Sequence, residues 1–162
     1  MALSIAIAAI GAARSGPEAE LFERYRTRFD ALAPRVGLKP LAVKIGDPAK
    51  RLTGRKRRDA EASWLLAAAP QACIFVSLDE GGDPLSTQRF CDFLAQKRDD
   101  GEAGIAFLIG GAEGHGGAVA AAAQRRIAFG VATWPHLLAR VMLAEQLYRA
   151  ATMLAGTPYH NA

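Results

Sequence analysis

The fold of this chain is decided by the stretch Ile105-Ala106-Phe107-Leu108-Ile109-Gly110-Gly111-Ala112-Glu113-Gly114-His115-Gly116-Gly117. Its first five residues are all apolar, which is typical of a strand covered on both faces of a parallel sheet. The next eight residues include five glycines, and glycine permits positive φ angles and lets a ligand lie against the backbone. The stretch therefore predicts a buried strand that opens into a ligand-binding loop.

Outside this stretch, apolar runs alternate with segments of helical period, which is typical of a parallel sheet with helices on its faces. The sequence contains no internal repeat and no linker-like segment. We therefore predict the α/β class and a single domain over residues 1–162. The predicted strands are Leu3–Ile10, Leu41–Ile45, Cys73–Leu78, Ile105–Ile109 and Ile127–Val131, and the predicted helices are Pro17–Phe29, Thr53–Ala69, Ser86–Arg98 and Pro135–Leu154.

Length and composition favour a globular domain that folds without disulfides or a structural metal. A chain of 162 residues with 51% hydrophobic and 22% charged residues can bury a core of its own. Cys73 and Cys91 lie in separate apolar runs, so we expect free buried thiols, a cytoplasmic location and no metal site. The apolar run Ala2–Ile10 lacks the basic start of a signal peptide and is shorter than the roughly twenty residues that span a bilayer, so we expect no membrane segment.

Positive charge is concentrated in one segment of the chain. The net charge is +4 and the sequence pI is about 9.4. Six of the nine residues from Lys50 to Arg58 are basic, and such a cluster can neutralise several phosphates of a nucleic acid. The segment therefore predicts either an RNA phosphate contact or a solvated helix face, and the sequence leaves both open.

The predicted last helix, Pro135–Leu154, carries apolar residues around more of its circumference than a single core-facing stripe requires. Such a helix must be covered on two sides. We expect the second cover to be another copy of the chain, which gives a homodimer. The alternative is a central helix that is wrapped within one subunit.

The glycine-rich segment after Ile109 fits neither common nucleotide-binding motif. No G-x-G-x-x-G fingerprint can be drawn, and no lysine follows the final glycine as in a P-loop, which disfavours a nicotinamide oxidoreductase or a kinase. In open parallel sheets, ligands bind outside the carboxyl ends of the strands. Leu78, Gly110 and the segment Phe129–Trp134 all follow predicted strands, so they predict one pocket for a flat heteroaromatic ligand such as adenine. The alternative is a set of ordinary tight turns.

Five ordered segments carry a resemblance to a known family. They are Leu78–Gly82, Phe107–Gly114, Thr133–His136, Arg140–Ala150 and Gly156–His160. Together they resemble the bacterial 23S ribosomal RNA pseudouridine N3-methyltransferases of the SPOUT superfamily, and the resemblance covers essentially the whole chain. It implies a SPOUT-type parallel sheet sandwiched by helices, a C-terminal trefoil knot and an obligate homodimer.

The resemblance also implies the ligand and the substrate. The cofactor is S-adenosylmethionine, and the substrate is N3 of a pseudouridine in 23S rRNA, methylated in the assembled ribosome. By matching position, the implied cofactor contacts are Leu78, Gly110, Phe129, Gly130, Val131, Ala132, Thr133 and Trp134.

The candidate catalytic residues are His136, Arg140, Tyr159 and His160. His136 or His160 would accept the N3 proton, Arg140 would neutralise charge on a carbonyl oxygen or phosphate, and Tyr159 would stack on or orient the base. We expect Tyr159 and His160 to come from the tail of the partner subunit. The alternative roles are structural, with His136 closing the first turn of the last helix and Arg140 forming a pair within the dimer.

The C-terminus departs from the family pattern. Family members usually end in Tyr-His-Arg, whereas this chain ends in Tyr159-His160-Asn161-Ala162. If the arginine binds RNA phosphate, Asn161 cannot replace its charge. The alternative function is therefore a catalytically weak or inactive protein that binds the ribosome or assists its assembly while it keeps the knot and the dimer.

Overall fold

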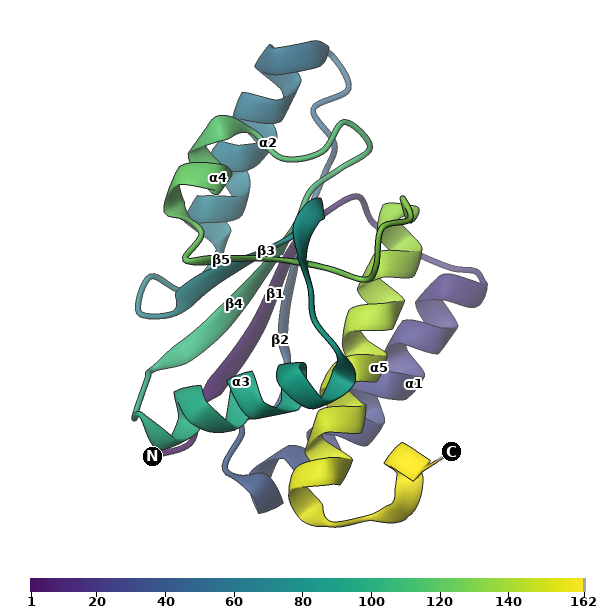
Figure 1. Ribbon diagram of the computed structural model, residues 1–162. Helices are drawn as coiled ribbons and strands as arrows, with labels where there is room; N and C mark the ends of the chain where they lie inside the picture. Colours follow the sequence, from purple (N-terminus) through teal and green to yellow (C-terminus); the bar gives the residue numbers. More distant parts are fainter. Residues whose placement is uncertain (162) are drawn as a thin grey trace.

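The computed structural model describes the backbone of residues 1–161 and the side chains of residues 1–159. All strand pairs in it are parallel, and they form one five-stranded sheet in the order β2-β1-β4-β3-β5 (Figure 1). The strands are β1 (Ser4–Ile10), β2 (Ala42–Gly46), β3 (Ile74–Pro84), β4 (Gly104–Ile109) and β5 (Arg125–Ala128). The predicted α/β class is confirmed.

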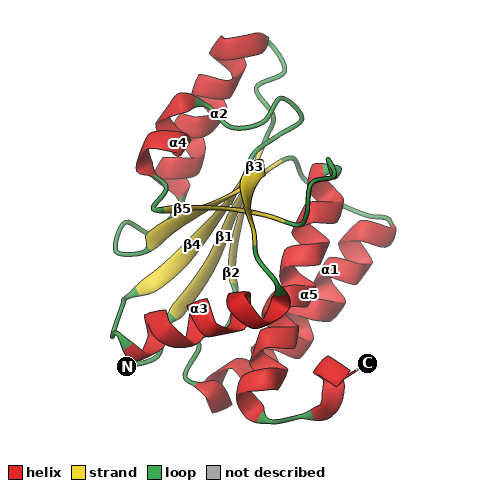
Figure 2. Cartoon of the chain, in the orientation of Figure 1, coloured by secondary structure: helices red, strands yellow, loops and turns green. Residues whose placement is uncertain are grey.

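Helices cover both faces of the sheet, as Figure 2 shows in red and yellow. The helices are α1 (Pro17–Leu32), α2 (Gly54–Ala68), α3 (Thr87–Asp99), α4 (Gly117–Ala122) and α5 (His136–Ala155), with 3-10 turns η1 (Ala33–Val36) and η2 (Pro158–Asn161). One apolar cluster joins the sheet to α1, α3 and α5, and a second joins it to α2 and α4. This arrangement gives three layers.

The central strands β1 and β4 are buried because their side chains meet helices on both faces. Every residue of β4 is buried, and alternate residues enter the two clusters: Phe107 joins the cluster under α3 and α5, whereas Leu108 joins the cluster under α2. Continuous apolar sequence is what such a doubly covered strand requires. The sequence prediction for Ile105–Ile109 is therefore confirmed, with one residue added at its start.

The predicted fifth strand, Ile127–Val131, is wrong in its bounds. The strand begins two residues earlier, at Arg125, and ends at Ala128. Gly130 has a φ angle of 84°, which leaves the extended region, and Val131 is 98% exposed, so neither residue continues a buried strand. Residues 129–134 form a loop instead.

Strand β3 is longer than predicted and bends around β5. Ile127 is paired first with Leu78 and again with Asp83, across a register shift. Gly82 lies so close that a Cβ there would approach the backbone nitrogen of Ile127 to 2.8 Å. The segment 79–82 thus arches over β5, and only glycine fits at its closest point.

The helix boundaries follow capping chemistry at several ends. Pro17 occupies the first turn of α1, where its missing N–H costs no hydrogen bond. Ser86 caps α3 as predicted, and its Oγ accepts a hydrogen bond of 3.2 Å from the backbone N–H of Arg89. Gly156 ends α5 with a φ angle of 71°. The short helix α4 was not predicted, because Ala-rich sequence after glycines carries little amphipathic signal.

Helix α5 packs against α1 and α3 within the same chain (Figure 1). Its buried positions include Leu143, Leu147 and Ala150, so two neighbours already cover much of its circumference. Leu138 remains 38% exposed near the start of the helix. Only the exposed surface around the first turns of α5 therefore remains for a second copy of the chain to cover.

Among residues 1–161, no helix combines the length and the apolar composition that a membrane crossing requires. Both cysteines are free thiols, as predicted, but only Cys91 is buried, whereas Cys73 is half-buried. Burial raises the pKa of Cys73 and of Cys91, so both thiols stay protonated at neutral pH.

Candidate active site

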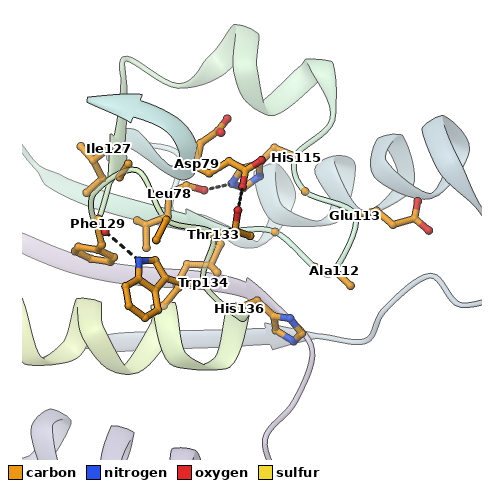
Figure 3. Close-up of a pocket in the computed structure, with 18 residues that line it drawn as sticks. Leu78, Asp79, Ala112, Glu113, His115, Ile127, Phe129, Thr133, Trp134 and His136 are labelled. Carbon is orange, nitrogen blue, oxygen red and sulfur yellow. Dashed lines mark hydrogen bonds between the residues drawn. The ribbon is translucent and has the colours of Figure 1, made fainter. Parts of the chain in front are cut away.

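A cavity of about 350 Å³ lies at the carboxyl ends of β4 and β5 and beside Leu78, where the pairing of β3 with β4 ends (Figure 3). Six of the eight predicted cofactor contacts line it: Leu78, Gly110, Phe129, Ala132, Thr133 and Trp134. The other two, Gly130 and Val131, belong to the same loop but do not line the cavity. The structure therefore brings together the three strand ends that the sequence predicted to meet.

Two hydrogen bonds fix the 129–134 loop. Trp134 Nε1 donates to the carbonyl oxygen of Phe129 at 2.9 Å, which closes the loop on itself. Thr133 Oγ1 donates to Glu80 Oε2 at 2.6 Å, which ties the loop to the segment after Leu78 (Figure 3). The loop needs a residue with positive φ to turn this tightly, and Gly130 supplies it.

The second wall is the glycine loop, residues 110–117. Its backbone turns at Gly114, which has a φ angle of 81° and donates a hydrogen bond of 3.0 Å to the carbonyl oxygen of Gly111. A Cβ on Gly110 would lie 3.0 Å from the carbonyl oxygen of Gly114. The tight turn therefore leaves the backbone itself as the lining of the cavity.

His115 anchors the glycine loop to β3. One of its ring nitrogens, Nε2, lies 2.9 Å from the carbonyl oxygen of Leu78, so the neutral ring donates through Nε2 (Figure 3). Burial lowers the pKa of His115, although the Leu78 carbonyl and the charge of Asp79 act in the opposite direction. The neutral imidazole therefore joins two walls of the cavity, and it also lines the cavity.

The cavity is apolar on one side and acidic on another. Ile109, Ile127 and Ala139 contribute apolar surface, whereas Asp79 and Glu80 contribute carboxylates. Burial raises the pKa of Asp79, but the Gly81 N–H and the Arg126 guanidinium outweigh it and lower the pKa below its usual value. The site therefore suits a ligand with a flat apolar portion and a cationic portion.

The sequence pattern does not assign Asp79 and Glu80 to the site, and it predicts Ile127 and Ala128 only as strand residues. The rule that ligands lie outside the carboxyl ends of parallel strands would have found all four, because Asp79 and Glu80 follow Leu78, where the pairing of β3 with β4 ends, and Ile127 and Ala128 end β5.

His136 is the first residue of α5 and lines the cavity. Its ring packs against Gly11, where a Cβ would lie 2.9 Å from His136 Nε2. Burial and the charge of Arg140 lower the pKa of His136, and the charge of Glu61 opposes them. The imidazole is therefore neutral at pH 7 and can accept a proton.

Arg140 does not line this cavity. Arg140 is 5% exposed, and its Nη2 donates to the carbonyl oxygens of Gly11 at 2.7 Å and of Ile10 at 3.4 Å. Arg140 and Leu137 line a second cavity of about 390 Å³ on the other side of the first turn of α5. Within the described part of the chain, Arg140 Nε has no hydrogen-bond partner.

Tyr159 lies far from His136 in its own chain. Its ring packs against that of Tyr148 in a tilted arrangement, with centroids 4.6 Å apart, and its hydroxyl donates to Glu145 Oε1 at 3.3 Å. Burial, a hydrogen bond with Tyr25 and the charge of Glu145 raise the pKa of Tyr159 to about 12. Since α5 has 20 residues, its two ends are roughly 30 Å apart.

The side chain of His160 lies outside the described residues, as does that of Asn161. Among residues 1–159, no group of three or more His, Cys, Asp or Glu side chains is placed to hold a metal ion.

The basic segment Lys50–Arg58 divides into two kinds of residue. The side chain of Arg55 is 89% exposed, and Lys56 is exposed as well. Arg57 is 18% exposed and is paired with Glu61 at 2.9 Å. Only the exposed residues are free to meet a phosphate.

Comparisons with known proteins agree on one family. A family model described as a predicted SPOUT methyltransferase matches residues 3–160. The ribosomal RNA large subunit methyltransferase H of Hyphomonas neptunium is 46% identical over 160 residues, which cover 99% of this chain and 100% of that protein. The protein of the same name from Dinoroseobacter shibae is also 46% identical, over 98% of this chain and 99% of that protein.

A crystal structure of a probable methyltransferase from Bordetella pertussis Tohama I has a TM-score of 0.52 to this structure. It covers 93% of this chain and 95% of that chain at 14% sequence identity, so the likeness concerns the fold alone. The family model and the full-length relatives lead to one conclusion: the chain belongs to the SPOUT methyltransferase family.

Proposed function

We propose that this chain transfers a methyl group from S-adenosylmethionine to N3 of a pseudouridine in 23S rRNA. The relatives named ribosomal RNA large subunit methyltransferase H support the choice of RNA, because they align over their full length. The observation that carries the proposal is the cavity where three strand ends and the glycine loop meet. The enzyme would act as one domain, in the cytoplasm, on the assembled ribosome.

The first cavity fits the proposed cofactor. Its volume of about 350 Å³ lies within the usual range for small-molecule sites. The apolar side at Leu78, Ile127 and Phe129 suits the adenine ring, and the carboxylates of Asp79 and Glu80 suit the positively charged portion. When bound, S-adenosylmethionine supplies an electrophilic methyl group, so the residues of the chain have only to position N3 and remove its proton.

Proton removal is assigned to a neutral histidine. The N3–H of a pseudouridine is an imide, so a weak base suffices when the developing negative charge is stabilised. His136 lines the cavity and is neutral at pH 7, which supports it as the acceptor. Arg140 would bind a carbonyl oxygen or a phosphate of the RNA that enters the second cavity. His160 is the second candidate for accepting the N3 proton, and Tyr159 would stack on or orient the base.

The position of Tyr159 supports a homodimer. Tyr159 packs near the carboxyl end of its own α5, whereas His136 begins that helix, so one chain does not bring them together. A second copy in antiparallel orientation would place the tail beside the cavity. Among residues 1–159, three of the six exposed large hydrophobic side chains, Val131, Trp134 and Leu138, lie within eight residues of sequence. Trp134 lines the cavity, which supports a covered surface there.

The crossing of β3 over β5 supports the proposed trefoil knot. Ile127 lies between Leu78 and Asp83, and the chain continues from β5 to Trp134 before it reaches α5. Threading a chain through such an arch is rare in proteins. The 129–134 loop and the 79–82 arch would then form the knot that frames the cofactor.

One experiment separates methyl transfer from the alternative of an inactive ribosome-binding protein. Purified protein, purified ribosomes that lack the modification and S-adenosylmethionine with a labelled methyl group are incubated, and label in 23S rRNA is counted. We expect label at one nucleotide. Ribosome binding without label would favour the alternative, which the replacement of the usual terminal arginine by Asn161 motivates.

A further inference from the structure

A buried ion pair on α2 lies behind the glycine loop, outside the first cavity. Glu61 is 3% exposed, and its Oε1 accepts hydrogen bonds from Arg57 Nε at 2.9 Å and from the backbone N–H of Ala49 at 3.0 Å. Arg57 Nη1 also lies 3.7 Å from Oε1 of Glu113, a residue of the glycine loop. In Figure 3, the Glu113 side chain points away from the other labelled side chains. One guanidinium therefore joins α2 to the loop that lines the cavity.

The loop backbone also rests directly on α2. A Cβ added to Gly111 would lie 2.8 Å from Glu61 Oε2, and a Cβ added to Gly116 would lie 2.7 Å from the carbonyl oxygen of Arg58. Glu61 Oε2 is buried and has no hydrogen-bond partner within residues 1–159. Any movement of Gly111 toward α2 is therefore blocked by a carboxylate that is itself fixed by Arg57 and Ala49.

We infer that Arg57 and Glu61 are positioning residues for the cofactor site. A buried carboxylate is costly unless it is paired, so the Arg57 pair fixes where the Glu61 carboxylate can lie. That carboxylate and the Arg57 guanidinium hold Gly111 and Glu113, and thereby the backbone that lines the cavity. Neither residue lines the cavity itself. The inference rests on the proposed function, because it takes the ligand of this cavity to be S-adenosylmethionine.

This role removes Arg57 from the candidates for RNA contact. Its neighbours on α2 provide a matched control, since Arg55 and Asp59 form another i,i+4 pair of Arg and acid, at 3.8 Å, on the exposed face of the same helix. The control pair does not contact the glycine loop. Effects of helix propensity or of total charge would appear in both pairs, whereas an effect on loop position would appear only in the Arg57–Glu61 pair.

The first test measures affinity and kinetics with the full-length protein. S-adenosylmethionine is titrated calorimetrically into the wild type, Arg57→Ala, Glu61→Gln, and the control Arg55→Ala. We expect roughly tenfold weaker binding for Arg57→Ala and Glu61→Gln, because misplaced backbone costs affinity. Arg55→Ala should bind as the wild type does, and Arg57→Lys should recover part of the loss. On ribosomes, Arg57→Ala should raise KM for the cofactor, while kcat and KM for ribosomes stay within about twofold of the wild type. Glu61→Gln is compared by calorimetry alone, because the Glu61 charge also acts on the pKa of His136.

The second test needs no cofactor. Hydrogen exchange is measured in the folded proteins at Gly114, whose N–H is bonded to the carbonyl oxygen of Gly111 at 3.0 Å. We expect faster exchange at Gly114 in Arg57→Ala and unchanged exchange in β4. Unchanged exchange at Gly114, or cofactor affinity equal to that of the wild type in folded Arg57→Ala, overturns the inference. If the wild type itself does not bind S-adenosylmethionine, the proposed function fails, and the exchange result alone decides whether the pair positions the loop.

Discussion

Trp134 Nε1 donates a hydrogen bond of 2.9 Å to the carbonyl oxygen of Phe129, and this bond closes the 129–134 loop at the mouth of the first cavity. Because the indole is 44% exposed, the bond rather than deep burial sets the position of the ring. Trp134→Phe removes the donor and keeps an aromatic ring. We expect about fivefold weaker binding of S-adenosylmethionine by calorimetry, which corresponds to the roughly 1 kcal/mol of a single hydrogen bond.

Trp64→Phe is the control for that substitution, since Trp64 packs over Gly46 of β2. Its affinity for the cofactor should equal that of the wild type. If Trp134→Phe also binds as tightly as the wild type, the closed loop has no part in holding the ligand.

The glycines of the loop differ in what a methyl group would meet. Gly111→Ala would place a Cβ 2.8 Å from Glu61 Oε2 and 3.1 Å from Ile10 Cγ2, whereas a Cβ at Gly117 has open space. We expect Gly111→Ala to lose about 1–3 kcal/mol of unfolding free energy through overpacking. Gly117→Ala lies at the start of α4 and should be neutral or gain up to about 1 kcal/mol. Urea denaturation measures both, and equal stabilities would show that the Glu61 carboxylate does not support the loop.

The pH dependence of stability should depend on His115. Burial lowers its pKa in the folded state, so the unfolded chain binds the proton more tightly. Stability is therefore full above about pH 6.5, the ordinary histidine value, and is lost as the pH falls through the lower folded-state pKa. His115→Gln keeps a donor for the Leu78 carbonyl and should reduce the fall in Tm between pH 7.5 and pH 5.5. The pKa of His136 is also lowered in the folded state, so part of the fall in Tm should remain in His115→Gln. A dependence of Tm on pH identical to that of the wild type would contradict the assignment to His115.

Mixed dimers test whether the tail acts on the partner subunit. His136→Ala and the double variant Tyr159→Ala/His160→Ala should each be inactive as homodimers. If the tail completes the partner's site, freely mixed subunits should recover about a quarter of wild-type activity, because half of the dimers have one intact site of two. No recovery after verified exchange of subunits would place the tail and His136 of one chain in the same site.

Charge reversal on the exposed face of α2 tests the RNA contact. Arg55→Glu with Lys56→Glu should weaken ribosome binding and reduce the steepness of its salt dependence, since each lost phosphate contact lowers the slope by about one. Reversal of the exposed Arg35 together with the exposed Lys39 changes the total charge by the same amount and serves as the control. Equal binding curves for the two variants would remove α2 from the RNA interface.

The sequence predicted those elements whose character is set by burial on both faces. The strand Ile105–Ile109 is continuous and apolar because helices cover it on both sides, and that property is visible without the fold. The meeting of Leu78, Gly110 and Trp134 was also predictable, because the carboxyl ends of parallel strands lie at one edge.

The sequence was less informative where contacts between residues far apart in the chain determine the local structure. Val131 is apolar and was assigned to a strand, yet it is 98% exposed, because Gly130 turns the chain away from the sheet. Arg57 is one basic residue among six by sequence, and only its pairing with Glu61 and Glu113 distinguishes it. Arg140 stays a proposed site residue, but its guanidinium also donates to the carbonyl oxygens of Ile10 and Gly11 at the end of β1, a contact that no local pattern indicates.

The most direct test of the central claim is mass spectrometry of 23S rRNA nucleosides from cells with and without this protein. We expect N3-methylpseudouridine to disappear when the gene is deleted and to return with the wild-type gene. We also expect that Gly110→Val, whose Cβ would lie 3.0 Å from the carbonyl oxygen of Gly114 and so displace the glycine loop, fails to restore the nucleoside while the folded protein still accumulates. An unchanged amount of N3-methylpseudouridine in the deletion strain would contradict the account.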